Sequence, residues 1–153
     1  MPNNNTNQTL IIKFLTLKNI DNANLSQVNH LIHQLAGFKV DHTKNSLKKF
    51  LSQPCLYQAG AFVDQELVGL ASLFVIEKIE YTTGAIEGVV VDENYRRQGV
   101  GQAMMRALIN QAKELELVHL DLTSNPTRVA ANRFYQKLGF EKRNTNVYRL
   151  KLN

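Results

Sequence analysis

The chain has the length, composition and charge that are typical of one soluble globular domain. It has 153 residues, of which 44% are hydrophobic and 20% are charged, and its formal net charge is +5. No apolar run approaches the roughly 18–20 residues of a membrane-spanning helix, and the N-terminal segment has neither the basic nor the apolar region of a secretion signal. We therefore expect a cytoplasmic protein with no membrane partner, in which residues 1–8 are a disordered tail and residues 9–153 form a single domain.

The expected elements follow from the spacing of apolar residues and from turn signals. Apolar residues at every third or fourth position predict helices, the first of which ends at Gly37, and short apolar or alternating runs predict strands. The polar turn at Asp64 and Gln65 between two such runs favours a β-hairpin. In chain order we predict a strand at 10–17, helices at 22–36 and 43–51, strands at 57–63, 67–79 and 86–91, a helix at 99–115, a strand at 118–123, a helix at 128–138, and closing strands near 140–142 and 147–152.

This order of elements predicts a mixed α/β fold. An antiparallel meander is followed by strand–helix–strand connections, so we expect a mixed central sheet of six to seven strands with helices on both faces. The helix at 99–115 is the right-handed crossover expected between two neighbouring parallel strands.

The one cysteine, Cys55, allows no intrachain disulfide and is either a small hydrophobe at the start of a strand or a nucleophile.

The segment Arg96-Arg97-Gln98-Gly99-Val100-Gly101 carries the strongest functional signal. It follows a buried strand and opens a helix. A helix N-terminus offers unpaired backbone N–H groups and a positive dipole end, and glycines let an anion's oxygens approach these groups. The segment therefore predicts a pyrophosphate cradle, and the alternative is a tight turn without a ligand. The pattern is neither G-x-G-x-x-G nor G-x-x-x-x-G-K-[ST].

Two motifs in this order resemble the GCN5-related N-acetyltransferase (GNAT) family. The first is Arg-x-x-Gly-x-Gly at 96–101, which is similar to the family's acetyl-CoA loop after its fourth strand. The second is the strand–turn–helix unit at 122–140, in which Asn and Ala precede Phe-Tyr and the helix closes with Gly-Phe. The resemblance covers roughly residues 57–152. It implies a sheet whose fourth and fifth strands run parallel and then splay apart, with acetyl-CoA in the gap.

The resemblance also assigns the expected contacts with acetyl-CoA. The backbone of residues 89–91 should pair with the pantetheine amides, and the N–H groups of residues 97–102 should hold the pyrophosphate. Either Arg96 or Arg97 should add a charge-assisted contact. Asn132 should bind the pantetheine or phosphate arm, whereas Asn-Pro at Asn125 is also a turn signal in its own right. The full expected set is Val89, Val90, Val91, Arg96, Arg97, Gln98, Gly99, Val100, Gly101, Gln102, Asn125, Asn132 and Tyr135.

Tyr135 and Glu87 are the candidate catalytic residues. Tyr135 occupies the position of a tyrosine that protonates the departing thiolate in many relatives. The alternative is a core aromatic, because only one of Phe134 and Tyr135 is expected to face the core.

Glu87 is the only acid in the apolar run 86–91, where a buried carboxylate would be costly, so we expect an opening to water there. The family often has a general base on this strand, and the alternative is a solvated strand-end charge. Glu87, Val89 and Val91 share one face only if no bulge intervenes, and relatives commonly have a bulge in this strand.

These features predict an enzyme that moves the acetyl group of acetyl-CoA to a primary amine by direct attack in a ternary complex. Residues 84–91 look somewhat like the corresponding strand of small-metabolite acetyltransferases, which favours a small-molecule acceptor. The alternatives are a protein or aminoacyl-tRNA amine, and a non-catalytic CoA-binding regulatory domain.

The positive charges are scattered, so we do not expect a nucleic-acid partner. The histidines lack metal-ligand companions, so we expect no metal, and relatives suggest a homodimer.

Overall fold

The structure of the protein is a computed structural model that describes residues 8–18 and 22–152. Contacts between Cα atoms divide the chain into two compact units, Met1–Leu122 and Thr123–Asn153. The predicted tail at residues 1–8 lies outside the described residues except for Gln8, and the single-domain organisation stays a prediction. No helix in the described part of the chain is both long enough and apolar enough to cross a membrane.

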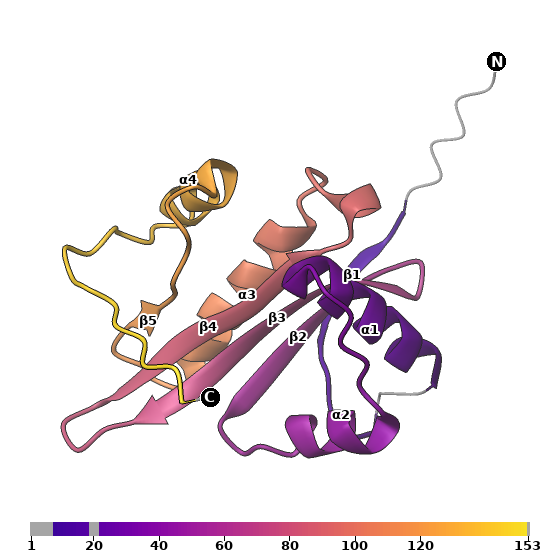
Figure 1. Cartoon of the computed structure of the whole chain (residues 1–153), viewed down its shortest axis with the longest axis horizontal. Coiled ribbons are helices and arrows are strands. Elements are labelled where there is room, and N and C mark those ends of the chain that lie inside the picture. The colour runs from indigo at the N-terminus through magenta and orange to yellow at the C-terminus, as the bar shows by residue number, and fades with distance from the viewer. Residues whose placement is uncertain (1–7, 19–21, 153) are drawn as a thin grey trace. The chain divides into compact units, whose positions relative to one another are not determined.

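The first unit is built on one mixed sheet of five strands in the order β1-β2-β3-β4-β5 (Figure 1). The first four strands form an antiparallel meander, and β5 runs parallel to β4. The predicted hairpin between β2 and β3 is confirmed, and Asp64 and Gln65 both have positive φ, at 48° and 72°, as a type I′ turn requires. The strands are β1 (Leu10–Phe14), β2 (Leu56–Val63), β3 (Glu66–Glu77), β4 (Thr82–Val91) and β5 (Leu120–Asp121).

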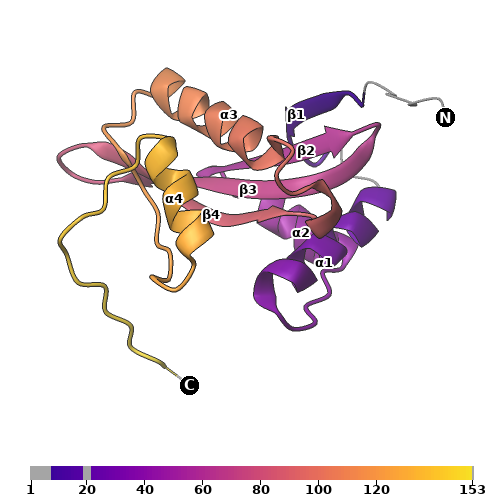
Figure 2. The same ribbon diagram turned by 90° about the horizontal axis from the view of Figure 1, so that it is seen from above.

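Helices cover both faces of this sheet, which confirms the mixed α/β class (Figures 1 and 2). Helices α1 (Asn22–Ala36) and α2 (Lys44–Leu51) lie together on one face, and α1 contacts β3 and β4. Helix α3 (Val100–Glu114) lies on the opposite face against β2, β3 and β4. A short 3-10 helix, η1 (Glu93–Tyr95), connects β4 to the start of α3.

Helix α3 packs through a stripe of apolar residues at helical spacing. On α3 the buried residues Val100, Met104 and Leu108 recur every fourth position, which places them on one side of the helix. A Cβ added at Gly69 of β3 would lie 2.8 Å from Cε of Met104, so a glycine there allows the helix to approach the sheet closely. The core on the face of α1 and α2 consists of Leu15, Val28, Leu31, Leu47, Phe62, Leu67, Leu70 and Val90.

The second unit contains one helix, α4 (Val129–Lys137). The predicted closing strands near 140–142 and 147–152 are wrong, because residues 138–152 form no strand. The sheet therefore has five strands among the described residues instead of six to seven. Alternating apolar residues form a strand only when another strand accepts their backbone hydrogen bonds, and here Val147, Tyr148, Leu150 and Leu152 are largely exposed.

Candidate functional site

Strands β4 and β5 pair only near the start of β4, which confirms the predicted splay. Gly84 pairs with Leu120, and Ala85 pairs with Asp121. Beyond Ala85, no strand among the described residues pairs with this edge of β4. The edge along residues 86–91 is therefore open to an extended ligand whose amide groups can form hydrogen bonds as an added strand.

A β-bulge in β4 determines which side chains share a face of the sheet. Ser72 pairs with Glu87 and Leu70 pairs with Val90, so Gly88 and Val89 together oppose one residue of β3. Gly88 has a φ of +62°, which suits glycine. Because directly paired residues lie on the same face, Glu87 shares the α1 face with Val90. The bulge is thus present, so Glu87, Val89 and Val91 do not share one face of the sheet.

Glu87 ends a polar row that crosses three strands on the α1 face. Gln58 of β2 pairs with Ser72 of β3, and Ser72 pairs with Glu87. Ser72 Oγ donates a hydrogen bond to Gln58 Oε1 over 2.6 Å, and both side chains are buried. Glu87 itself is exposed. Its carboxylate is therefore hydrated. Both roles considered for Glu87, a general base that acts through water and a solvated charge, require this hydration.

The segment 96–101 turns from η1 into the N-terminus of α3. Arg97 and Gly99 have left-handed backbone conformations, with φ values of 62° and 82°. Gly99 is the N-cap, no side chain caps the helix, and the first helical hydrogen bond runs from Ala103 N to Gly99 O over 3.0 Å. The backbone N–H groups of residues 100–102 precede that bond, so they have no partner within the helix. A Cβ at Gly99 would meet no atom within 4 Å, so the space at this helix end is open.

The two arginines of this segment have different environments. Arg96 Nε donates to Val91 O over 3.0 Å, and Arg96 Nη2 donates to Gln34 Oε1 over 3.1 Å. Arg97 forms no hydrogen bond or ion pair with any residue that the structure describes. Arg96 is therefore held by the protein itself, whereas the Arg97 guanidinium remains available to an anionic ligand.

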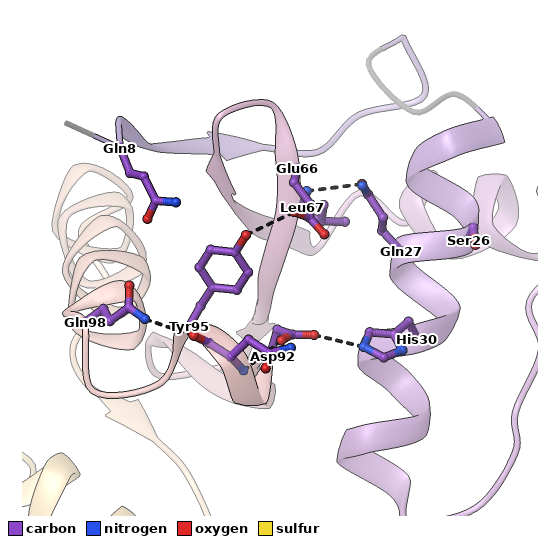
Figure 3. Close-up of a pocket in the computed structure, with 10 residues that line it drawn as sticks. Gln8, Ser26, Gln27, His30, Glu66, Leu67, Asp92, Tyr95 and Gln98 are labelled. Carbon is purple, nitrogen blue, oxygen red and sulfur yellow. Dashed lines mark hydrogen bonds and ion pairs between the residues drawn. The ribbon is translucent and has the colours of Figure 1, made fainter. Parts of the chain in front are cut away.

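Asp92 anchors the beginning of this loop. Its Oδ1 accepts a hydrogen bond from Asn94 N over 2.9 Å, and its Oδ2 lies 2.9 Å from His30 Nε2 (Figure 3). Burial alone would raise the pKa of the Asp92 carboxyl, but the hydrogen bonds from Asn94, His30 and Gln34 outweigh burial and lower that pKa from its ordinary value. The carboxylate is therefore ionised at neutral pH.

In the second unit, hydrogen bonds of Asn125 and Asn132 stabilise the turn that leads into α4. Asn125 Oδ1 accepts hydrogen bonds from Thr127 N over 2.9 Å and from Thr127 Oγ1 over 2.8 Å. Asn132 Nδ2 donates to Asn125 O and to Arg128 O, each over 2.9 Å. The Asn125 side chain thus supports the turn interpretation of Asn-Pro.

Tyr135 lies on α4 between two phenylalanines. Its ring centroid is 5.4 Å from that of Phe134 and 6.2 Å from that of Phe140. Phe134 and Tyr135 are both half-buried, so burial does not distinguish which of them faces the core.

Ser124 is a candidate that sequence reasoning missed. Its Oγ is buried and has no hydrogen-bond partner among the described residues. A buried hydroxyl without a partner is uncommon in proteins and marks a position where a ligand or water can be bound. Nothing in the sequence distinguishes this serine, because serine before Asn-Pro is ordinary in a turn.

The sequence model of the acetyltransferase (GNAT) family matches residues 26–140, which include both glycine-containing segments and the open edge of β4. The chain belongs to this family. A curated relative, [ribosomal protein bS18]-alanine N-acetyltransferase of Escherichia coli K12, is 28% identical over 74 residues, which are 48% of this chain and 50% of the relative. The chain thus spans about half the length of the curated relatives it matches.

Solved structures of GNAT proteins share the fold of this chain. An aminoglycoside acetyltransferase from an uncultured soil metagenomic sample, in complex with trehalose, is 22% identical with a TM-score of 0.80, and the match covers 93% of this chain and 96% of that one. An aminoglycoside N-acetyltransferase in complex with CoA is 16% identical with a TM-score of 0.75, and the match covers 95% of this chain and 97% of that one.

The residues of this GNAT protein fit acetyl-CoA, which the family uses as co-substrate. The uncapped N-terminus of α3 supplies donors and a positive dipole end for phosphate oxygens. A larger residue at Gly99 would strain its left-handed backbone, which has a φ of +82°. In the part of the chain that the structure describes, no group of three or more His, Cys, Asp or Glu side chains could hold a metal ion.

Proposed function

We propose that this GNAT protein transfers the acetyl group of acetyl-CoA to a primary amine in a ternary complex. The observation that carries the proposal is the combination of an open edge on β4 beyond Ala85 with an uncapped helix N-terminus at Gly99. One feature suits the amides of an extended pantetheine arm, and the other suits a pyrophosphate. Both lie at the end of β4 towards its C-terminus, in the order in which acetyl-CoA carries these groups.

The proposed binding residues follow from this arrangement. The backbone of residues 89–91 forms hydrogen bonds with the pantetheine amides, and the N–H groups of residues 97–102 hold the pyrophosphate. Arg97 adds a charge-assisted contact with a phosphate oxygen, since Arg96 is already bonded to Val91 O and Gln34. Asn132 binds the pantetheine or phosphate arm through its Oδ1, because its Nδ2 is used within the turn.

The chemistry requires few groups, because the thioester of the co-substrate is already activated. The amine nitrogen attacks the carbonyl carbon, the C–S bond breaks, and the acetyl group remains on nitrogen. In our proposal Glu87 accepts a proton from the incoming ammonium through water, and Tyr135 donates a proton to the departing thiolate. The exposure of Glu87 supports a route through water.

A small molecule is the proposed acceptor. The likeness of the fold to aminoglycoside acetyltransferases is compatible with a small amine. A protein α-amine is the second candidate, and the curated relative that acts on an alanine of ribosomal protein bS18 favours it. A homodimer and the absence of a nucleic-acid partner stay predictions.

The test is an amine panel in which the release of free CoA thiol is followed. The panel contains amino sugars, polyamines, amino acids and a peptide with N-terminal alanine, so the two acceptor classes are separated in one experiment. We expect saturable CoA release with at least one small amine. Acetylation of the peptide alone would instead indicate a protein acceptor, and acetyl-CoA binding without turnover of any amine would indicate a regulatory domain.

The control for the cofactor site is Gly101→Glu. A carboxylate in the first turn of α3 would repel the phosphates and fill the approach to the N–H groups, so we expect acetyl-CoA affinity to fall by about 10-fold or more. Calorimetric titration measures this affinity, and circular dichroism verifies the fold of the variant. A folded Gly101→Glu protein with unchanged affinity would contradict the proposed cradle.

A further inference from the structure

One side chain of α1 bonds to three positions of the segment that leads into the pyrophosphate loop. Gln34 Nε2 donates to Asp92 Oδ2 over 3.0 Å. Gln34 Oε1 accepts from Glu93 N and from Arg96 Nη2, each over 3.1 Å. The donor and the acceptor of this amide are therefore both used, and all three bonds end on residues 92–96.

Hydrogen bonds, more than apolar packing, connect α1 to this segment. A cavity of about 630 Å³ lies between the start of β3, α1 and residues 92–98 (Figure 3). Its lining is polar and includes His30, Glu66, Asp92 and Tyr95, with Leu67 as its apolar residue. Since few apolar contacts can form across such a cavity, the bonds of the Gln34 amide and the His30 contact with Asp92 set the position of the segment relative to α1.

The segment needs such support because the turn directly after it is strained. Arg97 has a left-handed backbone, which a non-glycine residue adopts only where the surroundings impose it. Arg96 directly precedes it, and its guanidinium is fixed at one end by Val91 O and at the other by Gln34. Fixing Arg96 therefore fixes the direction in which the chain enters the turn at residues 97–99.

We propose that Gln34 is a positioning residue that holds the pyrophosphate loop, residues 96–101, in the conformation that binds phosphate. The proposal rests on the proposed function for the identity of the ligand. Apart from a contact with His30 on its own helix, Gln34 bonds to residues 92–96, the segment that ends at the first residue of the loop, and it acts on the co-substrate through that segment. Its loss should therefore weaken only those ligands that carry a pyrophosphate.

The chain offers a matched control on the same helix. Gln27 lies two helical turns before Gln34, is also half-buried, and its Oε1 accepts a hydrogen bond from Leu67 N over 3.1 Å. Gln27 connects α1 to β3 and has no hydrogen bond with residues 92–96 in the structure. Gln27→Ala therefore removes a glutamine and a bond between helix and sheet without changing the support of the loop.

The first measurement compares two ligands. Acetyl-CoA contains the pyrophosphate, and S-acetylpantetheine has the same acetyl-pantetheine arm without it. For Gln34→Ala we expect the Kd of acetyl-CoA to rise about 10-fold, as the loss of a bond to a charged group implies, and the Kd of S-acetylpantetheine to change less than about twofold. For Gln27→Ala we expect neither to change. Equal weakening of both ligands, or the same effect in Gln27→Ala, would overturn the proposal.

The second measurement needs no ligand. Hydrogen exchange of the backbone amides at residues 96–102 should be about 10-fold faster in Gln34→Ala than in the wild type or in Gln27→Ala, because the loop opens more often. Unchanged exchange in Gln34→Ala would overturn the positioning role. If the exchange result is as expected but the wild-type protein does not bind acetyl-CoA, the proposed function fails while the support of the loop by Gln34 stands.

Discussion

Arg97 and Gly99 both adopt left-handed backbone conformations, but the conformational free energy that this costs differs between the two residues. Glycine enters this region at little cost, whereas arginine pays a conformational cost of about 1–3 kcal/mol that the surrounding structure must offset. Such residues are concentrated where the backbone itself binds a ligand. The conformation of Arg97 thus agrees with a loop whose N–H groups, more than its side chains, contact phosphate.

The proposed acid role of Tyr135 is tested by Tyr135→Phe. The variant keeps the ring and its contacts with Phe134 and Phe140 but loses the hydroxyl. We expect kcat to fall by about 10²-fold, at the low end for general acid catalysis, with little change in acetyl-CoA affinity. Steady-state kinetics with the best amine of the panel measures kcat, and calorimetry measures affinity. An intact kcat would remove Tyr135 from the chemistry.

The proposed base role of Glu87 is tested by the pH profile of Glu87→Gln. An alkyl amine with a pKa of about 10 is protonated at neutral pH and needs a base, whereas at high pH the free amine needs none. We expect the rate of the variant to fall most at low and neutral pH and to approach the wild-type rate as pH rises. A decrease of equal size at every pH would mean that Glu87 is not the base and acts by positioning, and an unchanged rate would mean that it is only a solvated charge on β4.

At the scale of single residues, the sequence predicted the loop at 96–101 but not the hydrogen bonds of Gln34 that hold it. Gly99 and Arg97 belong to a local motif, so their place follows from neighbours in the chain. Gln34 and Asp92 are 58 positions apart, and nothing in a helical repeat indicates which polar residue of α1 will reach a distant loop. Ser124 was likewise missed, since its lack of a partner depends on the folded surroundings.

At the scale of elements, α1 is held to the sheet by a few buried residues, and Leu31 is completely buried among them. Leu31→Ala leaves a cavity under the helix, so we expect the free energy of unfolding to fall by about 2–5 kcal/mol. Urea denaturation measures this loss. Leu35→Ala, one turn later at a residue that is 36% exposed, is the matched control and should cost clearly less. Equal losses would mean that α1 is not held mainly by its buried stripe.

The helices were predicted more accurately than the strands, for a physical reason. A helix forms its backbone hydrogen bonds within itself, so the predicted ranges 22–36 and 99–115 agree closely with α1 and α3. A strand depends on a partner that the sequence does not name. The predicted strand at 118–123 pairs only at Leu120 and Asp121, and the predicted strands after α4 do not form.

At the scale of the whole molecule, the order of elements and two motifs were sufficient to predict the fold class and the family. The family match over residues 26–140 bears out the family, and the mixed sheet with helices on both faces bears out the fold class. The acceptor could not be predicted in the same way, because the charge of +5 and the composition suit many anionic ligands and say little about an amine.

The bulge at Gly88 shifts the alternation of side chains between the two faces of β4 by one residue. Upstream of it Glu87 points to the α1 face, and downstream of it Val90 points to that face again, three positions later instead of two or four. In a regular strand of the same sequence, Val90 would lie three positions after Glu87 on the opposite face, and it would leave the core that it shares with Leu70 and Leu31. In this sequence the bulge therefore places the hydrated Glu87 and the buried Val90 on the same face of β4.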